Sequence, residues 1–408
     1  MLIGTINVNY IYMMTELYIP QAQLTRLVHL VTPGKVVVVY GPRRVGKTTL
    51  IKRYIREHDP DALLVTGEDI VVREYLESQS LAKLTSFVGR RRTLIIDEAQ
   101  HIREIGLNLK LLADHVEGLR IIATGSSSFD LAHQTGEPLT GRKYTLLLLP
   151  LAQLEIQETE SAHQTRAHLE QRLIYGSYPE VVLMDSNEDR QLYIKELIAS
   201  YLFRDILQLE GIRHADKLLR LLQLVAFQIG REVSTSELGT QLGMNASTVD
   251  RYLDLLEKSY ILHSRRGFSR NLRKEITKSR RYYFYDNGIR NGLINNFNPL
   301  TIRDDVGELW ENYILAERLK YNLYNGRLVE SYFWRTYDRQ EIDLVEEWGG
   351  KLLAAELKWP AKSSRAPSAW RKAYPDSSFQ VVHPENYLEF ITGSAPKSSS
   401  EPKTSSAL

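Results

Sequence analysis

The 408-residue chain contains no cysteine. This absence excludes disulfide bonds and thiolate metal sites, and it suits a reducing compartment, so we expect the protein to be cytoplasmic. The chain also lacks any uninterrupted apolar stretch long enough to span a bilayer, so we expect no membrane segment. Its opening, Met1 to Met14, has neither a basic leader nor a small-residue cleavage site, so we expect no signal peptide.

Net charge is also small. The 52 basic and 50 acidic side chains give a formal charge of +2, so attraction to nucleic acid would require a local basic patch. The chain is too long for one compact core, and its length favours roughly two to four domains. Its hydrophobic content of 43% is enough to fill them.

One segment carries a complete phosphate-binding loop. It reads Gly-Pro-Arg-Arg-Val-Gly-Lys-Thr and directly follows the apolar run Val36 to Tyr40. The glycines let backbone N–H groups turn toward phosphates, and the helix that opens at Lys47 adds its positive end. We expect ATP or GTP to bind, with Lys47 on the outer phosphates and Thr48 on magnesium. The predicted nucleotide-binding residues are Gly41, Pro42, Arg43, Arg44, Val45, Gly46, Lys47, Thr48 and Thr49.

A second strand ends in two acidic residues, as the catalytic strand of such an enzyme would. Thr93 to Ile96 are followed by Asp97 and Glu98. We expect Asp97 to orient magnesium and Glu98 to polarise the attacking water. Acidic residues at a helix start also occur for purely structural reasons, but the phosphate loop favours catalysis.

Two further polar positions are candidates for contact with the reacting phosphate. A third apolar strand runs into Thr124, Gly125 and Ser126, where Ser126 is the preferred sensor of the terminal phosphate and Thr124 the alternative. Both also fit ordinary turn chemistry. Arg142 precedes another apolar strand and is a candidate for stabilising transition-state charge, in its own site or in a neighbour's. A solvated surface arginine remains the alternative.

Taken together, the motifs resemble a known family. They are the phosphate loop with Thr49, Asp97-Glu98-Ala99-Gln100, Thr124-Gly125-Ser126-Ser127, Gly141-Arg142 before Leu149-Pro150-Leu151, and Tyr175-Gly176-Ser177-Tyr178-Pro179-Glu180. They closely resemble the prokaryotic AAA-type ATPases that carry a C-terminal domain of uncharacterised function. This resemblance extends from about Pro20 to Leu388, and it implies ATP rather than GTP.

The resemblance also implies an α/β architecture. We expect a P-loop NTPase core at residues 20–150, a helical lid at 151–215, a winged helix-turn-helix at 216–285 and a restriction-endonuclease-like α/β domain at 300–390. Residues 394–408 are rich in Ser, Lys, Pro and Thr, which cannot build a core, so we expect a disordered tail.

The middle of the chain has helix-capping residues at the spacing of a helix-turn-helix. Ser234 begins a capping box, and Asn245 caps the next helix. A basic segment follows, from which we predict DNA-binding side chains within residues 234–281. These are Arg265, Arg266, Arg270, Arg273 and Lys274. Contact with a protein partner is the open alternative.

A second group of candidate catalytic residues lies near the C-terminus. Glu356 and Lys358 are two apart on an expected strand, so they share a face, and Asp343 lies on the strand before. Two carboxylates and a lysine in this order are typical of magnesium-dependent nucleases, with Glu308 of the preceding helix as a further ligand. An ordinary ion pair on a polar strand face fits as well.

These observations predict a magnesium-dependent ATP hydrolase acting with DNA, with a nuclease-like domain of open activity. An ATP-regulated protein-interaction switch without nuclease activity is the competing prediction. The sequence does not determine the oligomeric state.

Overall fold

A parallel five-stranded sheet begins the described part of the chain. The computed structural model describes residues 18–125, 139–202, 215–269, 280–336 and 338–393. The sheet has the order β2-β3-β4-β1-β5. Strand β1 is buried at every position because helices cover both faces, which explains its unbroken apolar sequence. The strands are β1 (Val36–Tyr40), β2 (Leu63–Thr66), β3 (Thr93–Asp97), β4 (Arg120–Gly125) and β5 (Lys143–Leu147).

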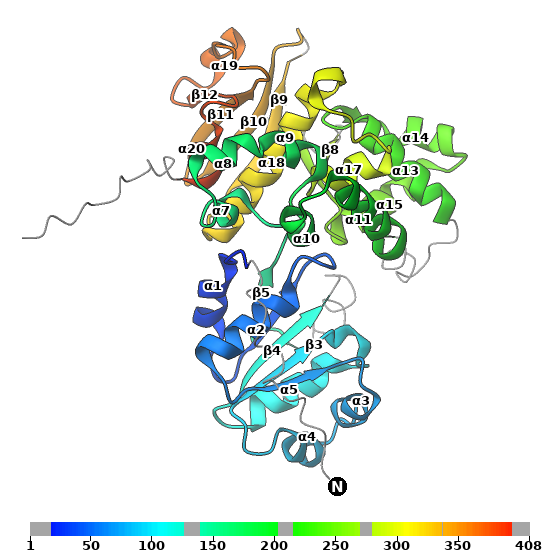
Figure 1. Cartoon of the computed structure of the whole chain (residues 1–408), viewed down its shortest axis with the longest axis vertical. Helices are drawn as coiled ribbons and strands as arrows, with labels where there is room; N and C mark the ends of the chain where they lie inside the picture. The colour runs from blue at the N-terminus through cyan, green and yellow to red at the C-terminus, as the bar shows by residue number, and fades with distance from the viewer. Residues whose placement is uncertain (1–17, 126–138, 203–214, 270–279, 337, 394–408) are drawn as a thin grey trace, which may run out of the picture.

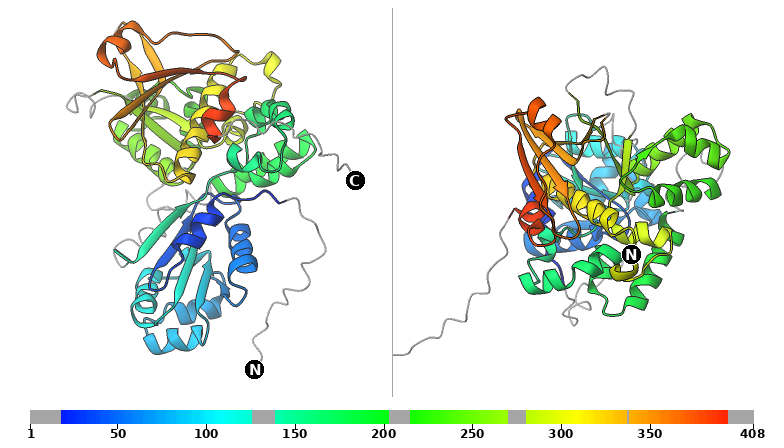
Figure 2. Two further views of the ribbon diagram at one scale, coloured as in Figure 1. Left: turned by 90° about the vertical axis from the view of Figure 1, so that its left-hand side faces the viewer. Right: turned by 90° about the horizontal axis from the view of Figure 1, so that it is seen from above.

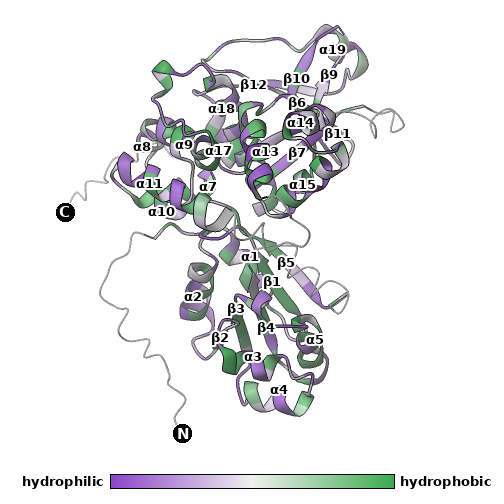
Figure 3. Ribbon diagram, turned by 90° about the vertical axis from the view of Figure 1, so that its right-hand side faces the viewer, coloured by the Kyte–Doolittle hydropathy of each residue, from purple (hydrophilic) through white to green (hydrophobic). Residues whose placement is uncertain are grey.

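The two faces of this sheet bury separate cores. Val37 packs in the same cluster as Leu50 of α2, whereas its neighbour Val38 packs with Leu109 of α5. Figure 3 shows the hydrophobic strands β1, β3 and β4 between these helices. The surrounding helices are α1 (Gln23–Leu30), α2 (Lys47–His58), α3 (Ile70–Leu76), α4 (Leu81–Val88), the short η2 (Ala99–His101) and α5 (Ile105–His115).

A helical segment follows β5 and joins this sheet to the rest of the molecule. The sheet lies at one end of the molecule and the remaining elements at the other, with α1 and β5 near the junction (Figures 1 and 2). The helices are α7 (Gln153–Ile156), α8 (Ala162–Ala167), α9 (Leu169–Tyr175), α10 (Pro179–Leu183), α11 (Asn187–Leu197) and the π-helical η3 (Ile198–Leu202).

In the described residues from 215 to 284, three helices and three short strands come next. They are α13 (Ala215–Phe227), β6 (Glu232–Val233), α14 (Thr235–Leu242), α15 (Ala246–Lys258), β7 (Leu262–Gly267) and β8 (Arg280–Phe284). Both predicted caps are confirmed: Ser234 accepts a hydrogen bond from the Glu237 N–H, and Asn245 accepts one from the Thr248 N–H at 2.8 Å. A tight turn therefore separates α14 from α15.

The C-terminal elements continue the same sheet. Its order is β12-β11-β10-β9-β7-β8-β6, and parallel pairing of β7 with β9 aligns Arg266 with Tyr332 and Gly267 with Phe333. The sheet thus crosses the boundary expected near residue 300. These elements are α17 (Asn287–Leu293), η4 (Leu300–Ile302), α18 (Val306–Tyr324), β9 (Glu330–Arg335), β10 (Glu341–Trp348), β11 (Lys351–Leu357), α19 (Ser368–Ala373), β12 (Ser378–Val382) and α20 (Tyr387–Thr392).

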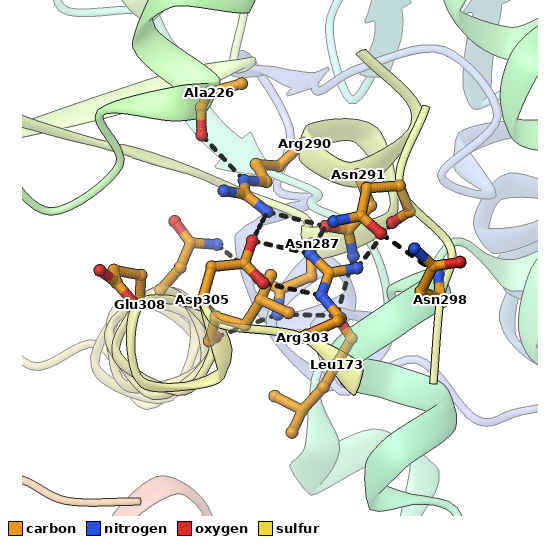
Figure 4. A network of polar contacts seen from close by, with 12 residues as sticks. Leu173, Ala226, Asn287, Arg290, Asn291, Asn298, Arg303, Asp305 and Glu308 are labelled. Carbon is orange, nitrogen blue, oxygen red and sulfur yellow. Dashed lines mark hydrogen bonds and ion pairs between the residues drawn. The ribbon is translucent and has the colours of Figure 1, made fainter. Parts of the chain in front are cut away.

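A polar network around Asp305 ties several of these elements together (Figure 4). The Asp305 carboxylate receives Arg290 and Arg303, with Arg303 Nε at 2.7 Å. Arg290 also donates to the Ala226 carbonyl at 2.9 Å, which links α17 to α13. Although burial raises the pKa of Asp305, hydrogen bonds and charge from the two arginines outweigh it and lower that pKa to about 2. The ionised carboxylate is thus stabilised by the fold.

Helix α18 also contacts the linker that follows β5. Its Glu317 accepts a hydrogen bond from the Gln153 N–H at 2.6 Å, and Tyr324 Oη accepts one from the Leu149 N–H at 3.0 Å. Glu155 in the same linker is buried, which raises its pKa to about 7. These contacts attach the C-terminal elements to the N-terminal sheet.

Composition predicted that the chain has no membrane segment and that it ends in a disordered tail. No helix among the described residues is long and apolar enough to cross a membrane. The predicted disordered tail, residues 394–408, lies outside the described residues.

Candidate nucleotide site and C-terminal acidic cluster

The phosphate-binding loop follows β1 and leads directly into α2. Gly41 has φ of +152°, and a Cβ there would lie 1.9 Å from the Leu148 carbonyl oxygen. Gly46 has φ of +93° at the N-cap of α2, and a Cβ there would lie 2.8 Å from Gln21 Nε2. Positive φ therefore explains both glycines of the motif, and close approach to the Leu148 backbone adds to the requirement at Gly41.

Lys47 occupies the centre of this loop. Its side chain is buried, and Nζ donates to the carbonyl oxygens of Gly41 at 2.9 Å and Pro42 at 2.7 Å. The ammonium group and the start of α2 thus bring positive charge to the same place. Such a loop is well suited to bind phosphate oxygens.

The two residues predicted to hold magnesium lie together. Thr48 Oγ1 donates to Asp97 Oδ2 at 2.8 Å, and Thr124 Oγ1 donates to the other carboxylate oxygen. The Glu98 N–H donates to Thr124 Oγ1 at 3.1 Å. A hydroxyl and a carboxylate in contact suit magnesium, which prefers a few oxygen ligands and keeps several waters. Sheet order explains the contacts, because β4 carries Thr124 between β1 and β3.

Glu98 lies beside this group, at the wall of a cavity of about 750 Å³. Its backbone is left-handed, with φ of +52°, and Gln100 Nε2 donates to Glu98 Oε2 at 2.5 Å. Lys47, Thr48 and Asp97 line the same cavity. The cavity therefore brings together the side chains predicted to bind phosphate, to hold magnesium and to activate water.

A second wall of the cavity comes from segments outside the sheet. One part is the segment before α1, and the other is the helical segment after β5. Arg44 of the loop reaches across to Glu180 of α10, with Nη1 and Oε1 3.3 Å apart. The lining residues on this wall are Tyr18, Ile19, Gln21, Leu151, Pro179, Glu180 and Leu183.

Arg142 does not belong to this site. The Val36 N–H donates to the Arg142 carbonyl at 2.8 Å, so Arg142 lies beside the first residue of β1. The phosphate loop follows the last residue of that strand, about 15 Å away at the usual rise per residue. Arg142 Nε instead pairs with Asp114 at 2.7 Å. The prediction that Arg142 acts in its own site is therefore wrong, and action on a neighbouring subunit stays a prediction.

The sensor candidates have different outcomes. Ser126, the preferred residue, lies outside the described residues. Thr124, the alternative, is buried and bridges Asp97 and Glu98 through its hydroxyl. Sequence reasoning undervalued Thr124 because it lies inside β4 rather than in the turn.

The DNA-binding prediction requires one correction. Arg265 is buried, with 3% of the residue exposed, and its Nη2 donates to the Leu315 carbonyl at 3.2 Å. It therefore cannot neutralise a phosphate on the surface. Arg266, the next residue on β7, is exposed. The remaining candidates Arg270, Arg273 and Lys274 lie outside the described residues.

The C-terminal acidic residues gather around Asp343 of β10. Burial raises its pKa well above the usual value, and the nearby carboxylates of Glu311 and Glu356 raise it further. Asp343 Oδ2 accepts a hydrogen bond from the Leu357 N–H at 2.7 Å. Lys358 Nζ lies 2.5 Å from Glu356 Oε1. We call Glu311, Asp343, Glu356 and Lys358 the acidic cluster.

The helix contributes Glu311 to this cluster, and Glu308 was the wrong choice. Glu308 pairs with Arg231 of the neighbouring turn at 3.5 Å. Burial raises the pKa of Glu311 to about 7, while Tyr283 donates to its Oε1 at 2.7 Å. Both residues are on α18, and sequence spacing alone cannot determine which turn of the helix faces β10. No three His, Cys, Asp or Glu side chains in the described ranges form a preformed metal site.

Comparisons with known proteins agree with the N-terminal site. Residues 33–157 match a family model described as an AAA domain. Residues 166–300 and 306–392 match two domains of unknown function, DUF8612 and DUF4143. Residues 33–157 thus form an AAA domain, and the parallel five-stranded sheet with its phosphate-binding loop is an α/β fold of the P-loop kind.

Two uncharacterized proteins are similar to this chain over most of its length. Uncharacterized protein Rv2008c of Mycobacterium tuberculosis is 30% identical over 341 residues, which cover 83% of this chain and 72% of that protein. Uncharacterized protein MJ1544 of Methanocaldococcus jannaschii is 24% identical over 382 residues, covering 88% and 82%. The chain belongs to the family of Rv2008c.

Solved structures resemble this chain only weakly. NtrX from Brucella abortus in complex with ATP has a TM-score of 0.26 at 16% identity, and covers 60% of this chain and 69% of that chain. CDC6P from Pyrobaculum aerophilum has a TM-score of 0.27 at 14% identity, covering 69% and 97%.

Proposed function

We propose that the protein is a magnesium-dependent ATP hydrolase that acts on DNA. The observation that carries the hydrolase proposal is the position of Asp97, whose carboxylate lies between the hydroxyls of Thr48 and Thr124. This arrangement adjoins Lys47 and Glu98 in one cavity. Phosphate binding, metal binding and water activation then have separate side chains within reach of one another.

Each side chain has a distinct role in this proposal. Lys47 and the N–H groups at the start of α2 bind the phosphates and stabilise their charge. Thr48 and Asp97 would hold magnesium, which supplies neutralising charge for the outer phosphates when it is bound. Glu98 orients the attacking water and accepts its proton. Gln100 positions the Glu98 carboxylate through its hydrogen bond.

Measurement of ATP turnover tests this proposal directly. We expect hydrolysis with magnesium, loss of hydrolysis on chelation, and a changed rate when DNA is added. Absence of turnover in the presence of magnesium, both with and without DNA, would contradict the hydrolase proposal. If hydrolysis occurs but DNA does not change its rate, the protein is an ATPase that does not respond to DNA.

The order of elements between α13 and β8 supports a DNA-facing role. Three helices, with β6 between the first two, are followed by the hairpin strands β7 and β8, an order typical of a winged helix. In that fold the third helix, here α15, and the wing approach DNA. Arg266 on β7 is the described wing residue best placed for a phosphate.

Two neighbouring arginines provide a matched test of DNA contact. Replacing the exposed Arg266 by Ser should weaken DNA binding for all sequences and lower the salt slope by about one phosphate contact. Replacing the buried Arg265 by Ser should lower protein stability but leave the salt slope of the folded protein unchanged. An unchanged slope in the Arg266 variant would exclude this residue as a DNA contact.

The acidic cluster supports a nuclease-like role for the C-terminal domain. Glu311 and Glu356 each lie near enough to Asp343 to raise its pKa, with Lys358 as the nearby cation, although the three carboxylates do not form a preformed metal site. Their mutual repulsion would be relieved by a divalent cation, and the lysine would stabilise developing negative charge. DNA is the substrate class because the cluster borders the proposed winged helix: Gly230 lies close to Glu311, with a Cβ there 3.2 Å from Oε2.

Cleavage assays test this second site. We expect cutting of DNA with magnesium or manganese, little with calcium, and none in Glu356→Ala, with ATP turnover intact because the sites lie apart. Glu311→Gln should reduce cutting strongly, whereas Glu308→Gln on the same helix should not. If wild-type protein cuts neither single-stranded, double-stranded nor branched DNA, the domain is a binding platform and not a nuclease.

An ATP-regulated protein-interaction switch is the second candidate function. The observation that favours it is the exposed face of α15, where Asp250 and Asp254 place negative charge beside Arg251 and where Asp254 pairs with Lys258, although a DNA-reading helix would need donors there. Arg280 and Arg281 of β8 also pair with Glu257 and Glu341 of the protein itself. Salt-dependent DNA binding would favour the first function, and its absence would favour the switch.

A further inference from the structure

The second wall of the cavity, which adjoins the phosphate loop, contains two buried polar atoms without hydrogen-bond partners. They are Gln21 Oε1 and Tyr18 Oη, which precede α1 and line the cavity. A buried acceptor that makes no hydrogen bond loses solvation without compensation. Such atoms therefore suggest a contact that a bound molecule would complete.

The orientation of Gln21 is fixed by its other end. Nε2 donates to the carbonyl oxygens of Val45 at 3.4 Å and Gly46 at 3.3 Å, both in the phosphate loop. These two acceptors determine which end of the amide is nitrogen and which is oxygen. Only 7% of Gln21 is exposed, and its backbone carbonyl accepts from the Leu24 N–H at 3.1 Å. The acceptor Oε1 is therefore held in place beside the loop.

The surroundings of Gln21 suit a flat ring rather than a phosphate. Ile19, Leu151, Pro179 and Leu183 give this wall of the cavity its apolar surface. A nucleotide whose phosphates lie on the loop would extend its base toward this wall. A base needs apolar contact on its faces and a few polar groups at its edges.

Resting on the ATP-binding function proposed above, we propose that Gln21 reads the nucleotide base. Its Oε1 accepts a hydrogen bond from the exocyclic amine of adenine. Guanine carries a carbonyl oxygen at that position, so two acceptors would face each other there. Gln21 would thus make the site selective for ATP over GTP, by satisfying one base and leaving the other unpaired. Tyr18 Oη, which can donate or accept, is the nearby group for a ring nitrogen.

Equilibrium binding of nucleotide analogues to the full-length protein tests the proposal without requiring turnover. The analogues are ATP, GTP, 2′-deoxy-ATP and purine riboside triphosphate, which lacks only the exocyclic amine. Wild-type protein should bind ATP about tenfold more tightly than purine riboside triphosphate, as expected for one neutral hydrogen bond. The affinity for 2′-deoxy-ATP should be close to that for ATP. GTP should bind more weakly than ATP or 2′-deoxy-ATP.

The variant Gln21→Met, which keeps the size of the side chain but has no acceptor, should lose this discrimination. It should bind ATP and purine riboside triphosphate equally. The matched control is Gln23→Met, because Gln23 is also buried but does not line the cavity and donates to the Leu147 carbonyl at 2.8 Å. The control should discriminate as the wild type does.

Several results would overturn the proposal. If Gln21→Met still prefers ATP over purine riboside triphosphate, another group reads the amine. If the substitution changes the ratio between ATP and 2′-deoxy-ATP instead, Gln21 contacts the ribose. Should Gln21→Met fail to fold, equal binding of ATP and purine riboside triphosphate by wild-type protein would still refute the idea. Tight binding of all analogues would refute base reading alone, whereas binding of none would refute ATP binding itself.

Discussion

The chain gathers acidic side chains at two places, and the two differ in what surrounds the carboxylates. At the end of β3, Asp97 accepts hydrogen bonds from the hydroxyls of Thr48 and Thr124. In the acidic cluster, Asp343 accepts one backbone hydrogen bond and lies near the carboxylates of Glu311 and Glu356, with Lys358 as the nearby cation. The first place is organised before any ligand binds. The second retains repulsion that a cation or a proton would relieve.

The largest effects should come from the first place, where separate side chains bind and react. Lys47→Ala should lower ATP affinity by about a hundredfold or more, because it removes the cation from the phosphates. Glu98→Gln should keep ATP affinity and lower kcat by about 10²- to 10³-fold. Binding and single-turnover measurements separate the two effects. Normal turnover by the Glu98 variant would remove it as the catalytic carboxylate.

A third carboxylate, Asp305, has the opposite environment to Asp343 because two arginines face it. Asp305→Asn should cost about 3 kcal/mol of unfolding free energy at pH 7, because it leaves Arg290 and Arg303 without their charged partner. The pKa of Asp305 falls from 3.8 to about 2, so the contribution is complete above the ordinary value and is lost as pH falls through about 2.

Urea unfolding at pH 7 and near pH 2 checks this expectation. The gap between wild type and Asp305→Asn should narrow at the lower pH. An equal gap at both values would mean that packing, and not charge, accounts for the loss.

Asp343 should behave in the reverse sense. Its pKa is raised in the folded protein, so its ionisation destabilises the fold as pH rises above the ordinary value of 3.8. Asp343→Asn keeps an acceptor for the Leu357 N–H, and it should raise stability by about 1 kcal/mol or more at pH 8 without divalent cations. Thermal unfolding with and without magnesium measures this. The substitution should also remove any stabilisation by magnesium.

The exposed Asp338→Asn serves as the control for that experiment, because it removes an acidic charge from a neighbouring turn. It should change neither the stability at pH 8 nor the response to magnesium. If Asp343→Asn lowers stability at every pH, the repulsion inferred for the acidic cluster is not present.

The smallest effect should come from Arg142, which pairs with Asp114 at a half-exposed position. Arg142→Ala should change stability by less than about 0.5 kcal/mol and leave turnover in a monomer unchanged. Mixing it with Glu98→Gln protein tests action between subunits. Recovered activity would support action on a neighbour, and no recovery together with a monomeric species would exclude it.

The sequence predicted best what depends on neighbours along the chain. The phosphate loop, the acidic end of β3 and the helix caps at Ser234 and Asn245 are each contained within a few residues. The position of Arg142 could also have been predicted. Arg142 precedes β5 and the phosphate loop follows β1, so in a parallel sheet the two lie at opposite ends of the strands. That signal was overlooked.

Other features depend on pairing between distant segments. Arg265 is buried because β7 is an interior strand with β9 on its far side, and no local pattern in a basic segment reveals this. Glu311 replaces Glu308 because of how α18 packs against the sheet. Thr124 gained its central role from β4, which lies between β1 and β3 although it follows β3 in the chain. Such relations require the three-dimensional structure.

The pairing of β7 with β9 has a consequence for how this protein can be divided or recombined. A cut between β8 and α18 would leave two fragments, each with an open strand edge that has lost its partner, and open edges promote aggregation. Recombination of the gene between these two segments would separate the paired strands in the same way. An exchange of the N-terminal ATPase preserves this sheet, whereas an exchange of the C-terminal domain alone breaks it. The segments that carry β7 and β9 must therefore be inherited, expressed and engineered as one unit.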